Sequence, residues 1–356
     1  MKNLSSLLTF PGNGVFTVHT AREKKEKLAE AYYSTTLLKA ESKWKASLTK
    51  LKDDRPLILG IPSDNGGGIQ RGANWGPLAV RQELLSDRKL FHDLGDVRVI
   101  PHLLHDKYLN TETIKECQRA LYGKVNKLPV SPLSIAENAA SEIYKAFPKA
   151  RIFGIGGDHS TSYPLVKAWL KSRKEKKKCG LLHFDAHTDL LDRRLGIDLC
   201  FGTWTFHILE ELTSTDHLLQ LGIRSSGKDK QHWKKKLGVE QFWASELKTW
   251  GVEKTFQKIS KHFDRIGVEE LYLSFDIDAL DIKYAAATGT PESSGLLPTD
   301  CAALIHLLGQ KYRITGADLM EVAPFVCPEG VSLSDRNASL SVAGDMARVM
   351  LENMQR

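Results

Sequence analysis

The chain has 356 residues, of which 42% are hydrophobic and 26% are charged, and it carries a formal net charge of +7. This composition is typical of a globular protein that buries a large core, and it excludes a chain too polar to fold. No apolar run approaches the roughly 18 residues that a membrane-spanning helix needs. The first residues, MKNLSSLLTFPGNG, contain too short an apolar stretch to predict a signal peptide.

The cysteines and the basic residues bear on location and partners. The five cysteines are scattered and include no CxxC pair, which favours reduced thiols in a cytoplasmic protein over a disulfide framework. The basic residues cluster in segments 22–52, 173–178 and 228–236, without a nucleic-acid-binding motif. We interpret segment 173–178 as a solvent-facing helix end, where cations are favourable. Neither a nucleic acid nor a membrane is therefore expected as a partner.

The N-terminal part of the chain is predicted to be helical. Over residues 21–54, apolar side chains such as Leu28, Leu38 and Trp44 recur among charged ones, a pattern that indicates one or two helices. We expect residues 1–55 to form a helical N-terminal extension, which packs on the following domain or on a neighbouring subunit.

From residue 56 onward, short apolar runs alternate with longer helical stretches. Continuous apolar runs separated by helices indicate a parallel sheet that is buried on both faces. No repeat, linker or low-complexity tract divides this region, so residues 56–356 are predicted to form one α/β domain with a mostly parallel sheet of about eight strands. The predicted strands are 56–62, 97–101, 151–157, 180–185, 218–223, 239–244, 270–278 and 314–322.

Four of these predicted strands end in polar residues. In a parallel sheet the chemistry belongs at the carboxyl ends of the strands, so these side chains are expected to converge at one edge. The residues concerned are Asp158 and His159, then Asp185, His187 and Asp189, then Asp276, Asp278 and Asp281, and finally Asp318 and Glu321.

Such a cluster of carboxylates requires compensating positive charge, because burying unpaired charges is costly. The four strand ends contain no lysine or arginine, so a divalent cation is the simplest compensation. Oxygen ligands with one or two imidazoles suit Mn²⁺ and related ions, and the absence of thiolates argues against a structural zinc site. The number of carboxylates suggests two ions, since a shared carboxylate can bridge a pair. Each motif alone could be a turn or a helix N-cap; the metal prediction depends on all four together.

These motifs resemble the signature set of the ureohydrolases, the arginase–agmatinase–formimidoylglutamase family. The similarity covers roughly residues 56–350, and segments 60–81 and 218–225 resemble the first strand–loop–helix of the family and an agmatinase-like strand. The matching motifs are GGDHS (156–160), DAHTD (185–189), SFDIDALD (274–281), ATGTPE (287–292) and MEVAP (320–324).

The resemblance implies a three-layer α/β/α fold and two Mn²⁺ ions per chain, although Ni²⁺, Co²⁺ or Fe²⁺ would accept the same ligands. It implies one ion held by His159, Asp185, Asp189 and Asp276, and another held by Asp185, His187, Asp276 and Asp278. Asp278 is further implied as a proton acceptor and Glu321 as the group that binds the substrate's amidine nitrogens, whereas Asp158 is expected to orient its loop. Gly156 and Gly157 are expected to let the backbone turn before His159. Family members form trimers or hexamers, so a homo-oligomer is expected.

The loop 190–209 departs from the family pattern. Phe201 stands where arginases and many agmatinases carry a proton-shuttling histidine, and His207 is interpreted as an ordinary helix residue. If Arg193 or Arg194 points inward, it would favour a substrate with a carboxylate; if both point outward, they face solvent. Trp204 is expected to narrow the substrate pocket.

The sequence therefore predicts a metal-dependent hydrolase that cleaves a C–N bond of a linear guanidino or amidine compound, such as an agmatine-like amine, a guanidino acid or a small guanidine, and releases urea. Two alternatives stay open. One is a formimidoylglutamase that releases formamide, and the other is a metal-binding family member without catalytic turnover.

Overall fold

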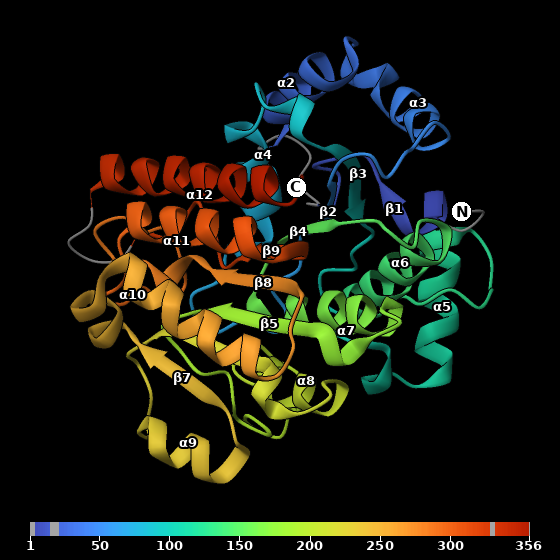
Figure 1. Ribbon diagram of the computed structural model, residues 1–356. Coiled ribbons are helices and arrows are strands. Elements are labelled where there is room, and N and C mark those ends of the chain that lie inside the picture. Colours follow the sequence, from blue (N-terminus) through green and yellow to red (C-terminus); the bar gives the residue numbers. More distant parts are fainter. Residues whose placement is uncertain (1–3, 15–20, 328–331, 356) are drawn as a thin grey trace.

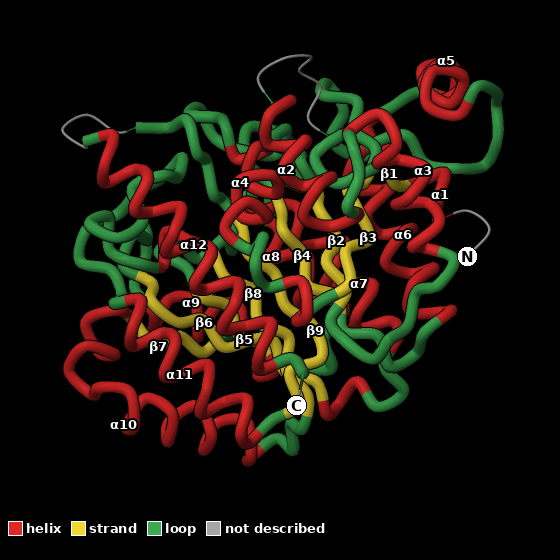
Figure 2. Tube along the Cα trace, turned by 90° about the horizontal axis from the view of Figure 1, so that it is seen from above, coloured by secondary structure: helices red, strands yellow, loops and turns green. Residues whose placement is uncertain are grey.

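The computed structural model describes residues 4–14, 21–327 and 332–355. Within these residues one nine-stranded sheet lies between helices on both of its faces (Figure 1, Figure 2). The strands are β1 (Leu8–Thr9), β2 (Leu57–Ile61), β3 (His92–Val97), β4 (Ile152–Gly156), β5 (Cys179–Phe184), β6 (Leu218–Ile223), β7 (Glu240–Trp243), β8 (Glu270–Asp276) and β9 (Arg313–Met320). The helices are α1 (Leu4–Leu7), α2 (Arg22–Tyr33), α3 (Leu37–Leu48), α4 (Gly76–Glu83), α5 (Thr111–Tyr122), α6 (Pro132–Ala146), α7 (Ser162–Ser172), α8 (Trp204–Ile208), α9 (Lys230–Leu237), α10 (Ala244–Arg265), α11 (Pro298–Lys311) and α12 (Leu333–Asn353).

The sheet order is β1-β3-β2-β4-β9-β8-β5-β6-β7, and every neighbouring pair is parallel except β1 and β3. The prediction of a mostly parallel sheet is therefore confirmed. All residues of β2, β4, β5 and β6 are buried. Helices on both faces account for this burial and for the continuous apolar runs in the sequence.

The helices form two outer layers. Contacts between neighbouring helices connect α10, α11, α12 and α4 on one side, and α6, α7 and α8 on the other. Helices α10, α11 and α12 lie next to one another along one side of the sheet in Figure 1. The predicted three-layer α/β/α architecture is thus present. None of the helices in the described parts of the chain is long and apolar enough to cross a membrane.

The strand predicted over residues 97–101 was placed wrongly, because the strand in this region is β3, His92–Val97. This strand contains two buried carboxylates, Asp93 and Asp96, so it has no continuous apolar run. The buried guanidinium of Arg81 on α4 pairs with both, at 2.7 Å from Nε to Asp93 Oδ2 and 2.5 Å from Nη1 to Asp96 Oδ1. The positive charge of Arg81 on α4 thus compensates the two negative charges on β3. A search for apolar runs cannot detect a strand of this kind.

The N-terminal segment packs on the edge of the sheet that β3 occupies. Helices α2 and α3 form within the region 21–54 that was predicted to be helical. Strand β1 pairs with β3 in antiparallel register. The Trp44 side chain is fully buried, and its indole N–H donates to the Leu94 carbonyl at 3.1 Å. Leu8 and Phe10 belong to the same hydrophobic core as the central strands. The division of the chain near residue 55 stays a prediction.

Candidate metal centre and active site

The four strand ends that carry the polar motifs belong to four adjacent central strands, in the order β4-β9-β8-β5. The registers pair Ile155 with Leu319, Met320 with Asp276, and Phe275 with Phe184. The parallel direction of these strands brings the residues that follow them together at the carboxyl edge. This is the edge of a parallel sheet where binding sites form.

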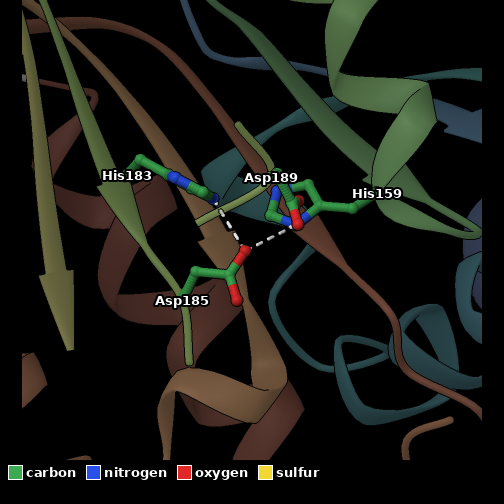
Figure 3. Close-up of side chains that lie close together, drawn as sticks. All are labelled: His159, His183, Asp185 and Asp189. Atoms are coloured by element: carbon green, nitrogen blue, oxygen red, sulfur yellow. Dashed lines mark ion pairs between the residues drawn. The ribbon is translucent and has the colours of Figure 1, made fainter. Parts of the chain in front are cut away.

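His159 and three carboxylates make up the most buried part of the site. Nδ1 of His159 lies 3.2 Å from Asp185 Oδ2, 3.5 Å from Asp189 Oδ2 and 3.0 Å from Asp276 Oδ2. The side chains of His159, Asp185 and Asp189 converge in Figure 3. The opposite ring nitrogen, Nε2, lies 3.0 Å from the Ser274 hydroxyl, which donates to Asp318 at 2.8 Å.

This hydrogen-bond chain indicates the role of His159. Because the Ser274 hydroxyl donates its hydrogen to Asp318, it accepts from Nε2 of His159. In the neutral ring, Nδ1 then presents a lone pair to three carboxylates, and this atom has no hydrogen-bond partner among the described residues. A lone pair facing carboxylate oxygens requires a cation between them. The residues therefore fit a metal ion, with the second ring nitrogen held as in known histidine metal ligands.

A second group of side chains lies beside the first and shares Asp185 with it. Nδ1 of His187 lies 3.1 Å from Asp278 Oδ2 and 3.5 Å from Asp185 Oδ1. The potential ligand atoms of His159, His183, Asp185 and Asp189 lie within 4.8 Å of one another, as do those of Asp185, His187 and Asp278. The arrangement thus offers two neighbouring cation sites with a common carboxylate. The side chain of His187 is 28% exposed, so the second group is the more open one.

Main-chain and hydroxyl donors hold these carboxylates in place. The main-chain N–H groups of His187, Ala186 and Asp278 donate to Asp185, Asp278 and Asp276, respectively, at 2.6–3.1 Å. The hydroxyl of Thr290 donates to Asp278 Oδ2 at 3.0 Å. Preorganised carboxylates cost little further ordering when a ligand binds.

The electrostatics of the site also indicate a need for cations. Burial is the largest influence on the pKa values of Asp189 and Asp276, and it raises both well above their usual range. Asp185 raises the pKa of Asp189 further, and Asp278 that of Asp276. Burial alone would lower the pKa of His159, but Asp185 and Asp276 raise it strongly. Such a cluster has to take up protons or bind cations to be stable.

Two side chains of the site sit on strained backbone. Asp189 and Glu321 have φ angles of 52° and 63°, a region that residues other than glycine rarely adopt. The Glu321 N–H donates to the Gly157 carbonyl at 2.9 Å, and its carboxylate accepts from the His159 N–H at 2.9 Å. These bonds position the buried Glu321 beside the two groups of potential metal ligands. Burial, followed by the Asp276 charge, raises the pKa of Glu321 well above its usual range.

Asp158 and the glycines before it organise the loop that carries His159. Asp158 accepts hydrogen bonds from Gly66 N and Ser160 N, each at 3.0 Å, in line with the expected orienting role. Neither Gly156 nor Gly157 has a positive φ angle, so the expected reason for these glycines does not apply. Close packing explains them instead, since a Cβ atom on Gly157 would lie 1.7 Å from the Ser63 carbonyl oxygen.

The sequence reasoning missed His183. This fully buried residue precedes Asp185 by two positions on β5, and its Nε2 lies 2.9 Å from Asp185 Oδ2 (Figure 3). The signal was present, because His183, Asp185, His187 and Asp189 follow one another at every second position. The histidine lies inside an apolar run, so the pattern indicates only a strand residue.

Trp204 and Phe201 occupy different places from each other. A cleft lined in part by His187 and Asp189 opens beside the cluster. Trp204 is fully buried and does not line this cleft. Its ring packs against His159 and His183, and its indole N–H donates to Asp189 Oδ2 at 2.9 Å. The structure therefore places Trp204 behind the cluster rather than at the substrate pocket. Phe201 does line the cleft, at the position where the resemblance led us to expect a histidine.

The two arginines of the loop also separate. Both arginines are exposed, but Arg194 lines the cleft and Arg193 does not. His207 lies on α8, where Nε2 is 3.0 Å from the Asp192 carbonyl oxygen, so it has an ordinary hydrogen-bonding role. Of the expected site residues, the structure thus brings together all six proposed metal ligands and Glu321, with Phe201 and Arg194 at the adjoining cleft.

A parallel α/β sheet whose central strands end in a buried cluster of carboxylates and imidazoles defines an α/β protein with a candidate metal centre at the carboxyl edge of its sheet. Residues 55–351 match the model of the arginase family, and the chain belongs to that family. It is a hydrolase that acts on the C–N bonds of guanidino compounds.

Individual relatives agree with this assignment. The chain is 30% identical over 283 residues to guanidino acid hydrolase, mitochondrial, of Homo sapiens, covering 75% of this chain and 71% of the relative. It is 28% identical over 287 residues to guanidinobutyrase of Pseudomonas aeruginosa, covering 75% and 78%. Proclavaminate amidino hydrolase from Streptomyces clavuligerus superposes with a TM-score of 0.63 at 25% identity, covering 85% of this chain and 92% of that one. Arginase from Bacillus subtilis shares the fold, with a TM-score of 0.64 at 20% identity and coverages of 83% and 98%.

Proposed function

We propose that this chain hydrolyses a linear guanidino compound to urea and an amine, using two divalent ions, Mn²⁺ or a related ion such as Ni²⁺, Co²⁺ or Fe²⁺. The observation that carries the proposal is the pair of ligand groups that share Asp185. By the family motifs, the residues that would hold the ions are His159, Asp185, Asp189 and Asp276 for one, and Asp185, His187, Asp276 and Asp278 for the other. When bound, two such ions act as Lewis acids and bring the pKa of a bound water close to neutral.

Glu321 would bind the substrate's guanidinium group. One of its carboxylate oxygens, Oε1, accepts from the His159 N–H, which fixes the side chain and leaves Oε2 for the substrate. A guanidinium offers N–H donors that suit a carboxylate, and such charge-assisted pairs are strong. Glu321 would thereby orient the guanidino carbon toward the metal groups.

Asp278 would carry a proton from the attacking water to the leaving nitrogen. Its Oδ2 is held by Thr290 and lies 3.1 Å from Nδ1 of His187. In the reaction, a C–O bond forms at the guanidino carbon and the C–N bond to the alkyl nitrogen breaks. Asp278 would accept a proton from the attacking water and deliver it to that nitrogen, so that one water is consumed and urea and an amine are released.

The decisive experiment measures both possible products. Metal-loaded protein is assayed for urea with agmatine, guanidinobutyrate, guanidinopropionate, arginine and guanidine, and for formamide with formimidoylglutamate. Elemental analysis of the same sample is expected to give about two ions per chain. Urea from none of the guanidino compounds would overturn the proposal.

Two further outcomes of this experiment define the alternatives. Formamide release without urea would identify a formimidoylglutamase, which the phenylalanine at position 201 permits because it replaces the expected shuttle histidine. A full metal content without hydrolysis of any substrate would identify a non-catalytic family member.

We also propose a cytoplasmic homo-oligomer, a trimer or a hexamer, with residues 1–55 as an extension of the catalytic domain. Free thiols at Cys117, Cys179, Cys200 and Cys301 support the location, and membership of the family supports the assembly. Light scattering of the full chain would test the assembly, with a monomeric mass contradicting it.

A further inference from the structure

A cleft next to the metal groups is large enough to hold the remainder of a small substrate. Its volume is about 460 Å³, and its lining includes His187 and Asp189 from the site itself. The remaining walls come from two segments that follow β5 and β6, namely residues 191–202 and 225–236. A molecule whose guanidino group lies at the metal centre can therefore extend its other end into this cleft.

The cleft is lined by positive charge. Arg194, Lys228 and Lys236 contribute cationic groups and His232 an imidazole, whereas Asp189, a proposed metal ligand, is the only carboxylate among the described residues that line the cleft. We propose that the substrate of this chain carries a carboxylate at the end opposite its guanidino group, and that Arg194 with Lys228 and Lys236 binds that carboxylate. This inference rests on the proposed function, because it names the substrate class for the same site.

The cations of the cleft have no carboxylate partners in the part of the chain that the structure describes. Among the residues that the structure describes, none of Arg194, Lys228 and Lys236 forms an ion pair. On helix α9, which carries Lys236, the neighbouring Lys230 and Lys234 are paired with glutamates that do not line the cleft. Unpaired cations grouped around a concave surface raise the local concentration of an anionic ligand and favour its binding.

Arg194 is held in place before any ligand arrives. Its main chain exchanges two hydrogen bonds with Ile197, at 2.8 and 2.9 Å, across a turn in which Leu195 and Gly196 have positive φ angles. This is the geometry of a tight two-residue hairpin turn. The guanidinium lies 4.8 Å from the centre of the Phe201 ring, a cation–π contact. Phe201 thus supports the arginine, and this gives a function to the residue that replaces the expected histidine.

The base of this hairpin is anchored to a distant part of the chain. Asp198 accepts a hydrogen bond from Lys107 Nζ at 2.8 Å and another from the Tyr108 hydroxyl, which in turn accepts from the Leu199 N–H at 3.0 Å. The main-chain N–H of Phe201 donates to the Gly66 carbonyl at 2.9 Å. A braced loop loses little conformational entropy when it binds a ligand, so Arg194 is well suited to select substrates.

A substrate with a cationic tail, such as agmatine, would meet repulsion in this cleft. One carboxylate, Glu292, could attract an ammonium group, since its Oε1 lies 3.5 Å from Nε2 of His187. Glu292 does not line the cleft and already contacts the imidazole. The charges that line the cleft therefore favour an anionic tail over a cationic one.

The experiment compares three guanidino compounds that differ in the charge of the tail: guanidinobutyrate, butylguanidine and agmatine. With the metal-loaded wild type, kcat/KM is expected to fall by about tenfold or more at each step from the acid to the neutral compound to the amine. Arg194→Gln should lower kcat/KM for the acid by about tenfold, mainly by raising KM. The value of kcat/KM for butylguanidine should stay nearly the same.

The matched controls lie next to the tested residues. Arg193→Gln and Lys235→Gln each remove an exposed cation that does not line the cleft, and they should leave kcat/KM for all three compounds unchanged. Lys236→Gln removes a cation that does line the cleft, and it should lower kcat/KM for guanidinobutyrate only. Equal or better hydrolysis of agmatine, or equal effects of Arg194→Gln and Arg193→Gln, would overturn the inference.

Binding measurements separate this inference from the proposed function. If no compound yields urea, the proposed function fails, and calorimetry with guanidinobutyrate and agmatine on the same metal-loaded protein still tests the cleft. Tighter binding of the acid, lost in Arg194→Gln and retained in Arg193→Gln, would support the anionic subsite. Equal binding of the two compounds would refute it.

Discussion

Two buried glutamines connect the indole of Trp243 to the imidazole of His183. The indole N–H can only donate, and it donates to Gln241 Oε1 at 3.0 Å; Gln241 Nε2 donates to Gln220 Oε1 at 2.8 Å. Gln220 Nε2 is then the donor to the Thr188 carbonyl at 2.7 Å and to Nδ1 of His183 at 2.9 Å. A neutral His183 must therefore carry its proton on Nε2, the nitrogen that lies 2.9 Å from Asp185 Oδ2.

This tautomer predicts that His183 supports Asp185 rather than binding a metal itself. His183→Ala should weaken metal binding by about 10- to 100-fold, because it removes a neighbour that orients the shared carboxylate. His183→Gln places an amide N–H near the position of Nε2 and should restore part of the affinity. Competition with a chelator measures both, and an unchanged affinity in His183→Ala would contradict the assigned role.

Asp278→Asn tests the proton transfer. The amide keeps the size of the side chain but cannot accept a proton as a carboxylate does, so kcat should fall by about 10²- to 10⁴-fold. Thr290→Val removes only the hydroxyl that donates to Asp278 Oδ2 and should have a smaller effect. Steady-state rates with metal analysis of each variant give the answer, and a fully active Asp278→Asn would exclude the role.

Glu321→Gln tests the binding of the guanidinium group. The glutamine can still accept from the His159 N–H through its carbonyl oxygen, so the loop should keep its structure. Loss of the charge should lower kcat/KM by about 10- to 100-fold, the value of a charge-assisted hydrogen bond. Unchanged kinetics with all guanidino substrates would show that another group binds the guanidinium.

Substitution of Arg224 tests how the segments around residues 278–280 and 292–293 are held in place. Its guanidinium donates at 2.7–3.2 Å to the main-chain carbonyls of Asp278, Ala279, Leu280, Glu292 and Ser293, among others. Arg224→Lys should destabilise the fold by about 2–4 kcal/mol, because a single ammonium cannot reach all these acceptors. Urea denaturation measures the loss, and kcat should fall as well. A fully stable and active Arg224→Lys would show that the carbonyls find other donors.

Trp44→Ala tests the attachment of the N-terminal helices. Removing this fully buried ring should cost about 3–5 kcal/mol of the free energy of unfolding. Trp44→Phe loses mainly the hydrogen bond to the Leu94 carbonyl and should cost about 1 kcal/mol. The metal content and kcat of the folded protein should stay unchanged, since Trp44 lies at the sheet edge. A loss of metal would show that the extension and the site are coupled.

The sequence alone determined the parallel sheet and the positions of the proposed metal ligands. Both depend on local patterns, namely apolar runs of strand length and polar residues directly after them, and a parallel sheet places such strand ends at one edge. The order β4-β9-β8-β5 explains why four motifs distant in the sequence form one cluster.

Tertiary structure alone decided the features that depend on contacts between distant residues. The strand β3 has buried aspartates that only Arg81, on another layer, makes acceptable. His183 looked like one more strand residue until its neighbours on β6 and β8 were known. The choice between Arg193 and Arg194 depended on a hairpin turn with positive φ angles, which determines which side chain faces the cleft. Periodicity predicts which face of an element is buried, but partners, tautomers and the direction of a loop are set by the packing of the whole chain.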